Sequence, residues 1–525
     1  MWRRNPDFCA NLVPMRPLVR EISTAPAPEF VMEQLQSEPG VVLLRSGLFD
    51  AAQARYSLVA ARPFLTFRSF GSRCELGFEN RGDVQFGNPW HLLERLMARY
   101  ELLDEVDLPF PLGGCFGYWG YDLKNFVEPK LPRRAANDLE LPDCHVGFYD
   151  SLVVFDHRLG KTWIVSTGLG ADGSRSHKRA REQVGYWQGR LSDEPRQTLM
   201  PAPGFGARQS SGALDFTVRA GEPEGPAQEQ TPAPKTFGGR IPKQLVGSNL
   251  SPSAFIALVE RAQAYIRAGD IYQVNLSQRL AARFPFSGWE LFQRLSAVSP
   301  APFSAFLDCG EFQIASSSPE LFLRLSGRHV QTRPIKGTRP RSTDPARDAQ
   351  LTYELQTSTK EMAELVMITD LLRNDMGKVC EFGSVQVPEL VRLERYPQVQ
   401  HLVSTVEGRL RPDTTHLAAF ASSFPGGSVT GAPKFRAIEI IDELEPITRG
   451  PYTGALGYLG FNRESQLSII IRAAICKERT VYFHTGAGIV ADSVPAAEYE
   501  ETLAKARGFL QALHYDRLPQ RTVRA

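Results

Sequence analysis

Short apolar runs and one amphipathic stretch organise the first part of the chain. The amphipathic stretch, NPWHLLERLMARYELL at 88–103, has apolar residues at helical spacing. The run GGCFGYWGYDL at 113–123 mixes glycines and aromatics, which indicates a closely packed strand or its turn. The remaining runs have the length and composition of strands: VVLLRSG at 41–47, YSLVA at 56–60, DSLVVFD at 150–156 and TWIVST at 162–167.

The later part of the chain begins with a helix signal and continues with strands. Ser251 is a suitable N-cap, Pro252 suits the first helical position, and apolar residues then recur every three to four positions up to Ile266. The strands expected next are IYQVNLSQRL at 271–280, FSAFLD at 303–308, EFQIASSS at 311–318 and ELFLRL at 320–325. Because strands and helices follow each other without a strict βαβ order, the pattern predicts an α+β fold of antiparallel sheets with helices packed outside.

Between these two parts lies a segment with neither helical nor strand periodicity. It runs from about Asp193 to Asn249 and is rich in proline, glycine, alanine and glutamine. Such a composition is typical of a flexible linker. We therefore predict an N-terminal region over 1–192, a linker over 193–249 and a C-terminal region over 250–515.

Composition narrows the class of protein. The 525 residues include 42% hydrophobic and 22% charged residues, as expected of a folded chain with sizeable cores. The net charge is only +2, which gives no argument for nucleic acid or an anionic membrane as a partner. The seven cysteines form no C-x-x-C pair, and no run approaches 18 apolar residues. Reduced thiols and the lack of a signal-like start predict a cytoplasmic location.

Glu320 and Lys336 lie at the two ends of a strand–turn–strand pattern. A hairpin would bring them together, and a buried lysine near a carboxylate can act as a nucleophile or base. A simple salt bridge between them is the alternative.

The helical stretch 358–375 has apolar residues on nearly every side, which predicts a largely buried helix. Glu364 and Asp370 on such a helix would need a cation, a donor or a metal such as Mg²⁺. For Asp370 we prefer Arg373 as the partner.

Two glycine-rich stretches follow. PGGSVTGAPK at 425–434 leads into a helix, whose first N–H groups attract anions, but it lacks the Walker order. GAG at 486–488 permits close backbone approach, and it precedes an acidic cluster of Glu498, Glu500 and Glu501. For that cluster, a solvated helix start is the alternative.

Taken together and in order, these motifs resemble the chorismate-utilising enzymes, which include anthranilate synthase component I, aminodeoxychorismate synthase component I, and the isochorismate and salicylate synthases. The resemblance runs from about residue 250 to 513 and, more loosely, through the N-terminal region. It is carried by GDIYQVNLSQR, PIKGTRPR, DLLRNDMGKV, HLVSTV, FPGGSVTGAPK, GALGY, IIIRAA and GAGIVADS with EYEET. It implies the anthranilate synthase component I-like fold, a sandwich of antiparallel sheets with helices outside.

Two positions separate the reactions of this family. Isochorismate and salicylate synthases have a water-activating lysine where this chain has Gln273. Anthranilate synthases read P-I-A-G-T where this chain reads P-I-K-G-T, the pattern of aminodeoxychorismate synthases. The resemblance thus implies that Lys336 adds to C2 of chorismate, that the C4 hydroxyl leaves with Glu320 as general acid/base, and that ammonia then replaces the lysine.

The resemblance also implies roles for further residues. Glu364 and Glu501 are expected to hold Mg²⁺. The residues expected to bind chorismate are Gly337, Thr338, His401, Ser428, Tyr452, Arg472, Gly486 and Gly488. Ammonia would come from a separate glutamine amidotransferase subunit, since no such domain is recognised in this chain.

Some relatives also bind tryptophan in the N-terminal region. The matching positions are Ser46, Arg55, Tyr56, Pro302, Phe303 and Ser304. Gln53 stands where tryptophan-binding relatives have an aromatic residue, so occupancy by tryptophan is left open.

Rival interpretations are anthranilate synthase component I, against which Lys336 argues, and a non-catalytic chorismate- or tryptophan-binding subunit. Binding alone needs no nucleophile, which argues against the second. A nucleotide-binding role for the loop at 425–436 is the most remote, because neither a Walker lysine nor a Rossmann fingerprint is present.

Overall fold

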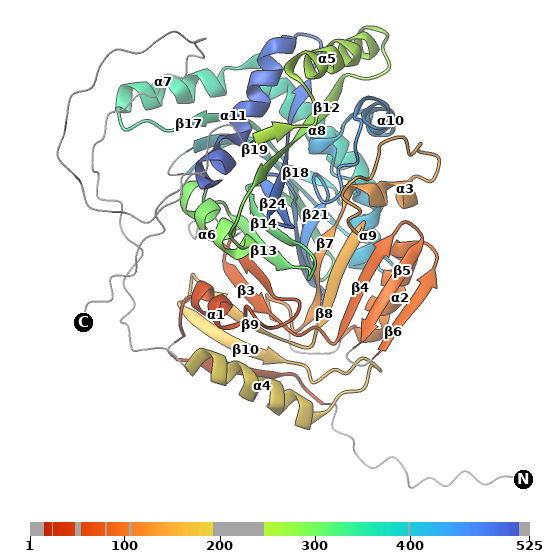
Figure 1. The fold of residues 1–525 in the computed structure, drawn as a ribbon, viewed down its shortest axis with the longest axis vertical. Coiled ribbons are helices and arrows are strands. Elements are labelled where there is room, and N and C mark those ends of the chain that lie inside the picture. The colour runs from red at the N-terminus through yellow and green to blue at the C-terminus, as the bar shows by residue number, and fades with distance from the viewer. Residues whose placement is uncertain are drawn as a thin grey trace, which may run out of the picture.

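Two large antiparallel sheets form the body of the protein (Figure 1). The computed structural model describes residues 15–23, 25–47, 54–78, 81–103, 108–192, 246–396 and 399–513. Within these residues each sheet has twelve strands, and helices cover the outer faces. The predicted α+β class and the sandwich of antiparallel sheets are therefore confirmed.

The order of the strands across each sheet does not follow the order of the chain. Sheet A consists of β1 (Leu18–Ile22), β10 (Lys161–Ser166), β9 (Ser151–Asp156), β3 (Tyr56–Ala60), β2 (Val42–Arg45), β13 (Phe303–Asp308), β14 (Gln313–Ser318), β23 (Ala473–Lys477), β24 (Thr480–Ile489), β12 (Gln273–Arg283) and β11 (Val246–Ser248), with β20 (Gly431–Ala432) also paired to β12. Sheet B consists of β17 (Ile335–Pro340), β19 (Val399–Arg409), β16 (His329–Arg333), β15 (Leu321–Ser326), β22 (Glu464–Ile469), β21 (Ala455–Gly460), β7 (Gly114–Trp119), β8 (Cys144–Tyr149), β4 (Leu65–Phe70), β5 (Arg73–Phe78) and β6 (Arg81–Phe86), with β18 (Gln386–Arg395) also paired to β19.

The helices lie outside these sheets. They are α1 (Pro28–Gln34), α2 (Pro89–Tyr100), α3 (Lys124–Val127), α4 (His177–Ser192), α5 (Pro252–Arg267), α6 (Gly288–Val298), α7 (Pro345–Gln356), α8 (Thr359–Gly377), α9 (His416–Ser423), α10 (Lys434–Leu444) and α11 (Pro495–Leu513), with short 3₁₀ turns at Tyr121–Leu123 and Gly427–Val429. As expected, α5 starts at Ser251, whose hydroxyl accepts a hydrogen bond from the backbone N–H of Ala254.

Alternating side chains divide the interior into layers. On β3, Leu58 points into the core between the sheets while Val59 joins the core beneath α4, α6 and α11. On β7, Phe116 faces the same inter-sheet core while Cys115 packs towards α2 and α9. This period of two explains why the sequence shows short apolar runs where each strand is buried on both faces.

Both sheets contain strands from both ends of the chain. In sheet A, β2 pairs with β13, and in sheet B, β7 pairs with β21. The N-terminal and C-terminal regions of the sequence are therefore joined by continuous hydrogen-bonded sheets. The predicted linker lies outside the described residues except for 246–249, of which 246–248 form β11.

One prediction about a helix is wrong. Helix α8 is not buried on all sides, because Met362 and Val366 are 37% and 43% exposed. One face of the helix packs on sheet B, α9 and the turn at Gly427–Val429, while Met362 and Val366 lie on a face that meets solvent. Asp370 is exposed and pairs with Arg373, the partner that the sequence favoured. No helix among the described residues has the length and apolar character needed to span a membrane.

Candidate active site

A bulge in β17 presents Lys336. The pairing of β17 with β19 shifts between Lys336 and Thr338, so Gly337 is the extra residue, with φ +69°. A side chain at Gly337 would come within 2.7 Å of Leu355, which restricts this position to glycine. The Lys336 side chain is 15% exposed, and its Nζ lies 3.6 Å from Oε2 of Glu364 on α8.

Gln273 and Gly488 form the wall beside this lysine. Gln273 begins β12 and donates a hydrogen bond from Nε2 to the same Glu364 oxygen, at 3.2 Å. Gly488 lies on the neighbouring strand β24, and a Cβ there would be 2.7 Å from Gln273 Nε2 and 3.8 Å from Lys336 Nζ. Glycine at 488 therefore keeps open the space next to the amine.

Glu320 is a buried carboxyl close to Lys336. The β15–β16 hairpin brings the two together, as the sequence predicted. Burial raises the pKa of Glu320 to about 7, although a hydrogen bond from Ser428 and the charge of Lys336 both act to lower it. The Ser318 hydroxyl accepts from the backbone N–H of Glu320, and Ile469 N–H donates to the Glu320 carbonyl. The chain thus holds an acid that can give or take a proton near neutral pH.

Glu501 brings a second carboxylate to the same site from α11. Burial opposes its ionisation, but Lys505, Lys360 and Lys336 together lower its pKa. The Oε1 atom of Glu501 lies 2.8 Å from Nζ of Lys505, which also donates a hydrogen bond to the Gly486 carbonyl. The charge of Lys336 thus acts on Glu501 while Lys336 itself contacts Glu364.

Glu364 and Glu501 are the two carboxylates that could hold a magnesium ion. Mg²⁺ takes one or two protein carboxylates and completes its shell with water and substrate oxygens. Among the described residues no group of three or more His, Cys, Asp or Glu side chains could hold a metal. An ion here would therefore need ligands from water or substrate.

Arg472 is an anion-binding candidate. It follows β22 in a left-handed conformation, with φ +50°, and desolvation lowers its pKa. None of the carboxylates in the described part of the chain forms an ion pair with it. A partly buried guanidinium that no described carboxylate pairs with is suited to a substrate carboxylate.

His401 and Tyr452 are two further residues that are expected to bind the substrate. Thr338 Oγ1 lies 2.8 Å from His401 Nδ1, and burial together with the charge of Arg472 lowers the pKa of His401 to about 4. His401 is therefore neutral and can hydrogen-bond without adding charge. Tyr452 stacks on His484 with ring centres 4.9 Å apart, and a side chain at Gly486 would reach its hydroxyl.

The structure therefore places Lys336 beside Glu364 and near Glu320, and Thr338 beside His401. The catalytic, metal-binding and substrate-binding roles expected for the site residues stay predictions. Sequence reasoning missed Lys505, which neutralises Glu501. Its signal was present as the i,i+4 spacing of an acid and a lysine on one helix.

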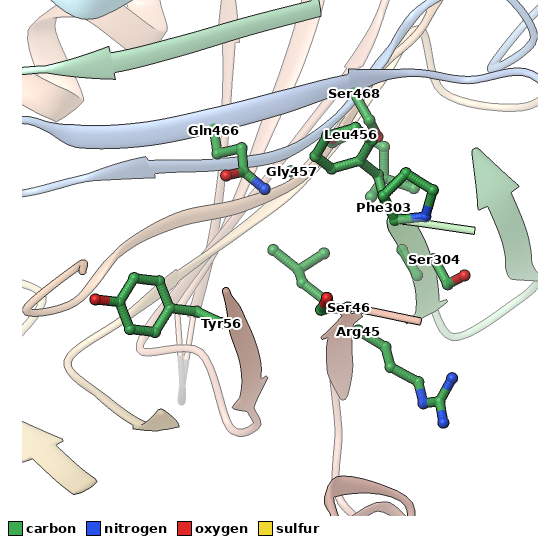
Figure 2. A pocket seen from close by; sticks show the side chains of 12 residues that line it. Arg45, Ser46, Tyr56, Phe303, Ser304, Leu456, Gly457, Gln466 and Ser468 are labelled. Carbon is green, nitrogen blue, oxygen red and sulfur yellow. Dashed lines mark hydrogen bonds between the residues drawn. The ribbon is translucent and has the colours of Figure 1, made fainter. Parts of the chain in front are cut away.

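Most of the residues expected to bind tryptophan line a different pocket, which is small and open to solvent on one side (Figure 2). Five of the six expected residues line it: Ser46, Tyr56, Pro302, Phe303 and Ser304. Arg55 does not, because it pairs with Asp156 at 2.6 Å. Gln53 lies outside the described residues. Occupancy by tryptophan stays a prediction.

Comparison with known proteins places this geometry in a family. The model of the family described as chorismate binding enzyme matches residues 48–511. The chain is 38% identical over 490 residues to aminodeoxychorismate synthase component 1 of Klebsiella aerogenes, covering 93% of this chain and 96% of the relative. It is 37% identical over 463 residues to anthranilate synthase component 1 of Acetivibrio thermocellus, covering 88% and 87%.

A solved structure shows the same fold. Anthranilate synthase component I from Streptococcus pneumoniae TIGR4 superposes with a TM-score of 0.70 at 29% identity, covering 88% of this chain and 93% of that one. The family match extends through the N-terminal region, where the motifs alone were looser. Relatives of both activities are about equally similar, so overall identity does not separate them.

Proposed function

The chain belongs to the chorismate-binding enzymes, and within this family we propose that it converts chorismate and ammonia into 4-amino-4-deoxychorismate through a lysine-linked intermediate. The observation that carries the proposal is the position of Lys336. This amine stands between the carboxylate of Glu364 and the buried acid Glu320. Anthranilate formation needs no amine there, whereas covalent catalysis does.

The reaction follows from this arrangement. Once Lys336 has lost its proton it attacks C2 of the ring, the two ring double bonds each move by one position, and the C4–O bond breaks. Glu320 gives its proton to the departing hydroxyl, which leaves as water, and the carboxylate can then accept the proton released by the lysine nitrogen. Ammonia forms the C4–N bond, the C2–N bond breaks, and the amine is restored. The enolpyruvyl group stays on the product.

Chorismate is a dianion, so each of its two carboxylates needs a positively charged or hydrogen-bonding partner. We propose that Arg472 and Tyr452 bind one carboxylate, with backbone groups at Gly337, Thr338, Gly486 and Gly488 around the ring and with His401 and Ser428 lining the pocket. Glu364 and Glu501 would hold Mg²⁺, which supplies positive charge for the ring carboxylate.

Ammonia is proposed to come from a glutamine amidotransferase subunit. The relatives are named component 1, which supports a second component. The six described cysteines are free, which supports a reducing compartment such as the cytoplasm. The product would serve 4-aminobenzoate and folate synthesis.

The test is a product assay on the purified chain with chorismate, Mg²⁺ and ammonium at mildly alkaline pH, read by mass spectrometry. An aminated product that keeps its enolpyruvyl group supports the proposal. Anthranilate with free pyruvate would assign the chain to the other activity, and a chain that leaves chorismate intact would be a binding subunit.

Replacing Arg472 with methionine is expected to raise KM for chorismate about 100-fold, since a charge-assisted contact to the substrate is lost. The free energy of unfolding should not fall, because no described carboxylate pairs with this guanidinium. Arg463→Met is the matched control, because Arg463 also has a positive φ but pairs with Glu101. It should lose stability and keep KM; the opposite pattern would remove Arg472 from the binding site.

Replacing Glu364 or Glu501 with glutamine is expected to weaken Mg²⁺ binding at least about 10-fold. Calorimetry on the chain without substrate measures the affinity, and the Mg²⁺ concentration giving half-maximal turnover measures its consequence. Glu500→Gln, which changes the exposed neighbour of Glu501, should alter neither. Unchanged Mg²⁺ affinity in both site variants would contradict the assignment.

A further inference from the structure

A lysine outside the pocket holds the loop that contacts the buried acid. The loop runs from α9 to α10 and contains Ser428, which donates a hydrogen bond to Glu320. Ser428 is therefore the contact through which this loop can influence the carboxyl group.

The loop packs between helix α8 and the end of strand β22. A Cβ at Gly427 would come within 2.7 Å of Leu371 on α8, and a Cβ at Gly426 within 2.6 Å of Ile469. Ile469 is also the residue whose N–H donates to the Glu320 carbonyl. A displacement of the loop would therefore move Ser428 relative to both the backbone and the side chain of Glu320.

Lys434 ties the start of the loop to α8. Its Nζ donates to the carbonyls of Ser423 at 3.0 Å and Pro425 at 2.9 Å, and to the carboxylate of Asp375. Asp375 is 2% exposed in its side chain and Lys434 is 14% exposed, so the pair is largely removed from water. An ammonium with three protein acceptors is fully satisfied and fixed in position.

The end of the loop has its own anchor. Arg449 donates to the Val429 carbonyl at 3.1 Å and forms a buried ion pair with Glu445 at 2.7 Å. Ser428 therefore lies between the two carbonyls that Lys434 binds and the one that Arg449 binds. Arg449 also bonds to the Asn275 carbonyl, so its loss would disturb several elements at once. Among the described residues the Lys434 ammonium donates hydrogen bonds only to this loop and to Asp375, so Lys434 is the better residue to substitute.

Asp375 connects this anchor to the nucleophile. It lies eleven residues after Glu364 on α8, which is about three turns, so both carboxylates lie on nearly the same face of the helix. One end of that face meets Lys336 and the other end meets Lys434. Helix α8 therefore contacts both Lys336 and Lys434.

We propose that Lys434, with Asp375 as its counter-ion, is a positioning residue that keeps Ser428 hydrogen-bonded to Glu320. The catalytic meaning of this inference rests on the proposed function, in which Glu320 protonates the leaving hydroxyl. Lys434 touches neither substrate nor reacting atoms and acts through the loop.

The test compares Lys434→Met with Lys378→Met. Lys378 pairs with the same Asp375 at 3.0 Å, but its side chain is 50% exposed and its ammonium does not reach the loop carbonyls that Lys434 binds. The readout is the carboxyl titration of Glu320, measured by infrared difference against Glu320→Gln. Because the Ser428 hydrogen bond lowers the pKa of Glu320, its loss should move the titration upward by about one pH unit.

The expected result is the same upward shift in Lys434→Met and Ser428→Ala, no further shift in the double variant, and none in Lys378→Met. In turnover, the alkaline limb of kcat should move by the same amount while KM for chorismate stays within about twofold. An unmoved Glu320 titration with a general loss of thermal stability would overturn the proposal and leave Lys434 with a structural role only.

Two further measures keep the outcomes separate. If Lys434→Met does not fold, Asp375→Asn removes the contact through which Lys434 ties the loop to α8, and a shift in the same direction is then expected. The titration needs no turnover, so a chain without amination activity would refute the proposed function while the titration still decides the role of Lys434.

Discussion

Replacing Lys336 with alanine is expected to lower the rate of amination by about 10³-fold or more, because the nucleophile of the first step is lost. The fold should survive, since Gln273 still donates to Glu364 after the lysine is gone. Chorismate consumption and product mass, measured with ammonium in place of the partner subunit, check the expectation. Retention of the aminated product at the wild-type rate would mean that ammonia attacks the ring directly.

The covalent step can also be observed without turnover. Incubating the wild-type chain with chorismate and Mg²⁺ in the absence of ammonia should leave a lysine-linked intermediate, whose mass is that of chorismate less one water. After denaturation and digestion the added mass is expected on the peptide with Lys336. The surface residue Lys161, which pairs with Glu21 at 3.0 Å, provides the control, and Lys161→Ala should change neither rate nor adduct.

Local patterns predicted much of the fold, and they did so for a clear reason. The strands at 56–60, 151–156 and 303–308 are recognisable because β-branched and aromatic residues fit a buried pleated sheet. The pairing of β2 with β13 could not be predicted, because contacts between strands more than 250 residues apart leave no local signature. Helix α8 was misjudged because apolar residues on its outer face looked like core residues.

The residues in and around the site were also predictable only in part. Lys336, Glu320, Glu364 and Glu501 were predicted from motifs and from the resemblance to a family. Lys434 and Asp375 lie 59 residues apart, and no spacing rule links them. Their role depends on where a loop is placed in three dimensions, which only the structure shows.

Replacing Glu320 with glutamine is expected to lower kcat by about 10²–10⁴-fold, since an amide cannot protonate the departing hydroxyl. In the wild type, burial raises the pKa of Glu320 to about 7, so the protonated form is lost as the pH rises above that value. The alkaline fall in kcat should therefore begin near pH 7 and be absent from the residual activity of Glu320→Gln. Asp308→Asn is the control, because burial also raises the pKa of Asp308 but it lies at the β13–β14 turn. A fall with the same midpoint in Glu320→Gln would assign the titration to another group.

The same substitution should make the protein more stable at high pH. Below about pH 4.5 Glu320 is protonated in both the folded and the unfolded chain, so it adds no pH dependence. Between pH 4.5 and 7 the unfolded chain ionises while the folded chain holds its proton, and the free energy of unfolding falls by about 1.4 kcal/mol per pH unit. The accumulated loss is about 3 kcal/mol at pH 8, and Glu320→Gln removes it. Urea unfolding at pH 4.5 and pH 8 should therefore show a gain for the variant only at the higher pH. An equal difference at both pH values would mean that the carboxyl ionises normally in the folded protein, and an acid with an ordinary pKa would be a poor proton donor to the leaving hydroxyl near neutral pH.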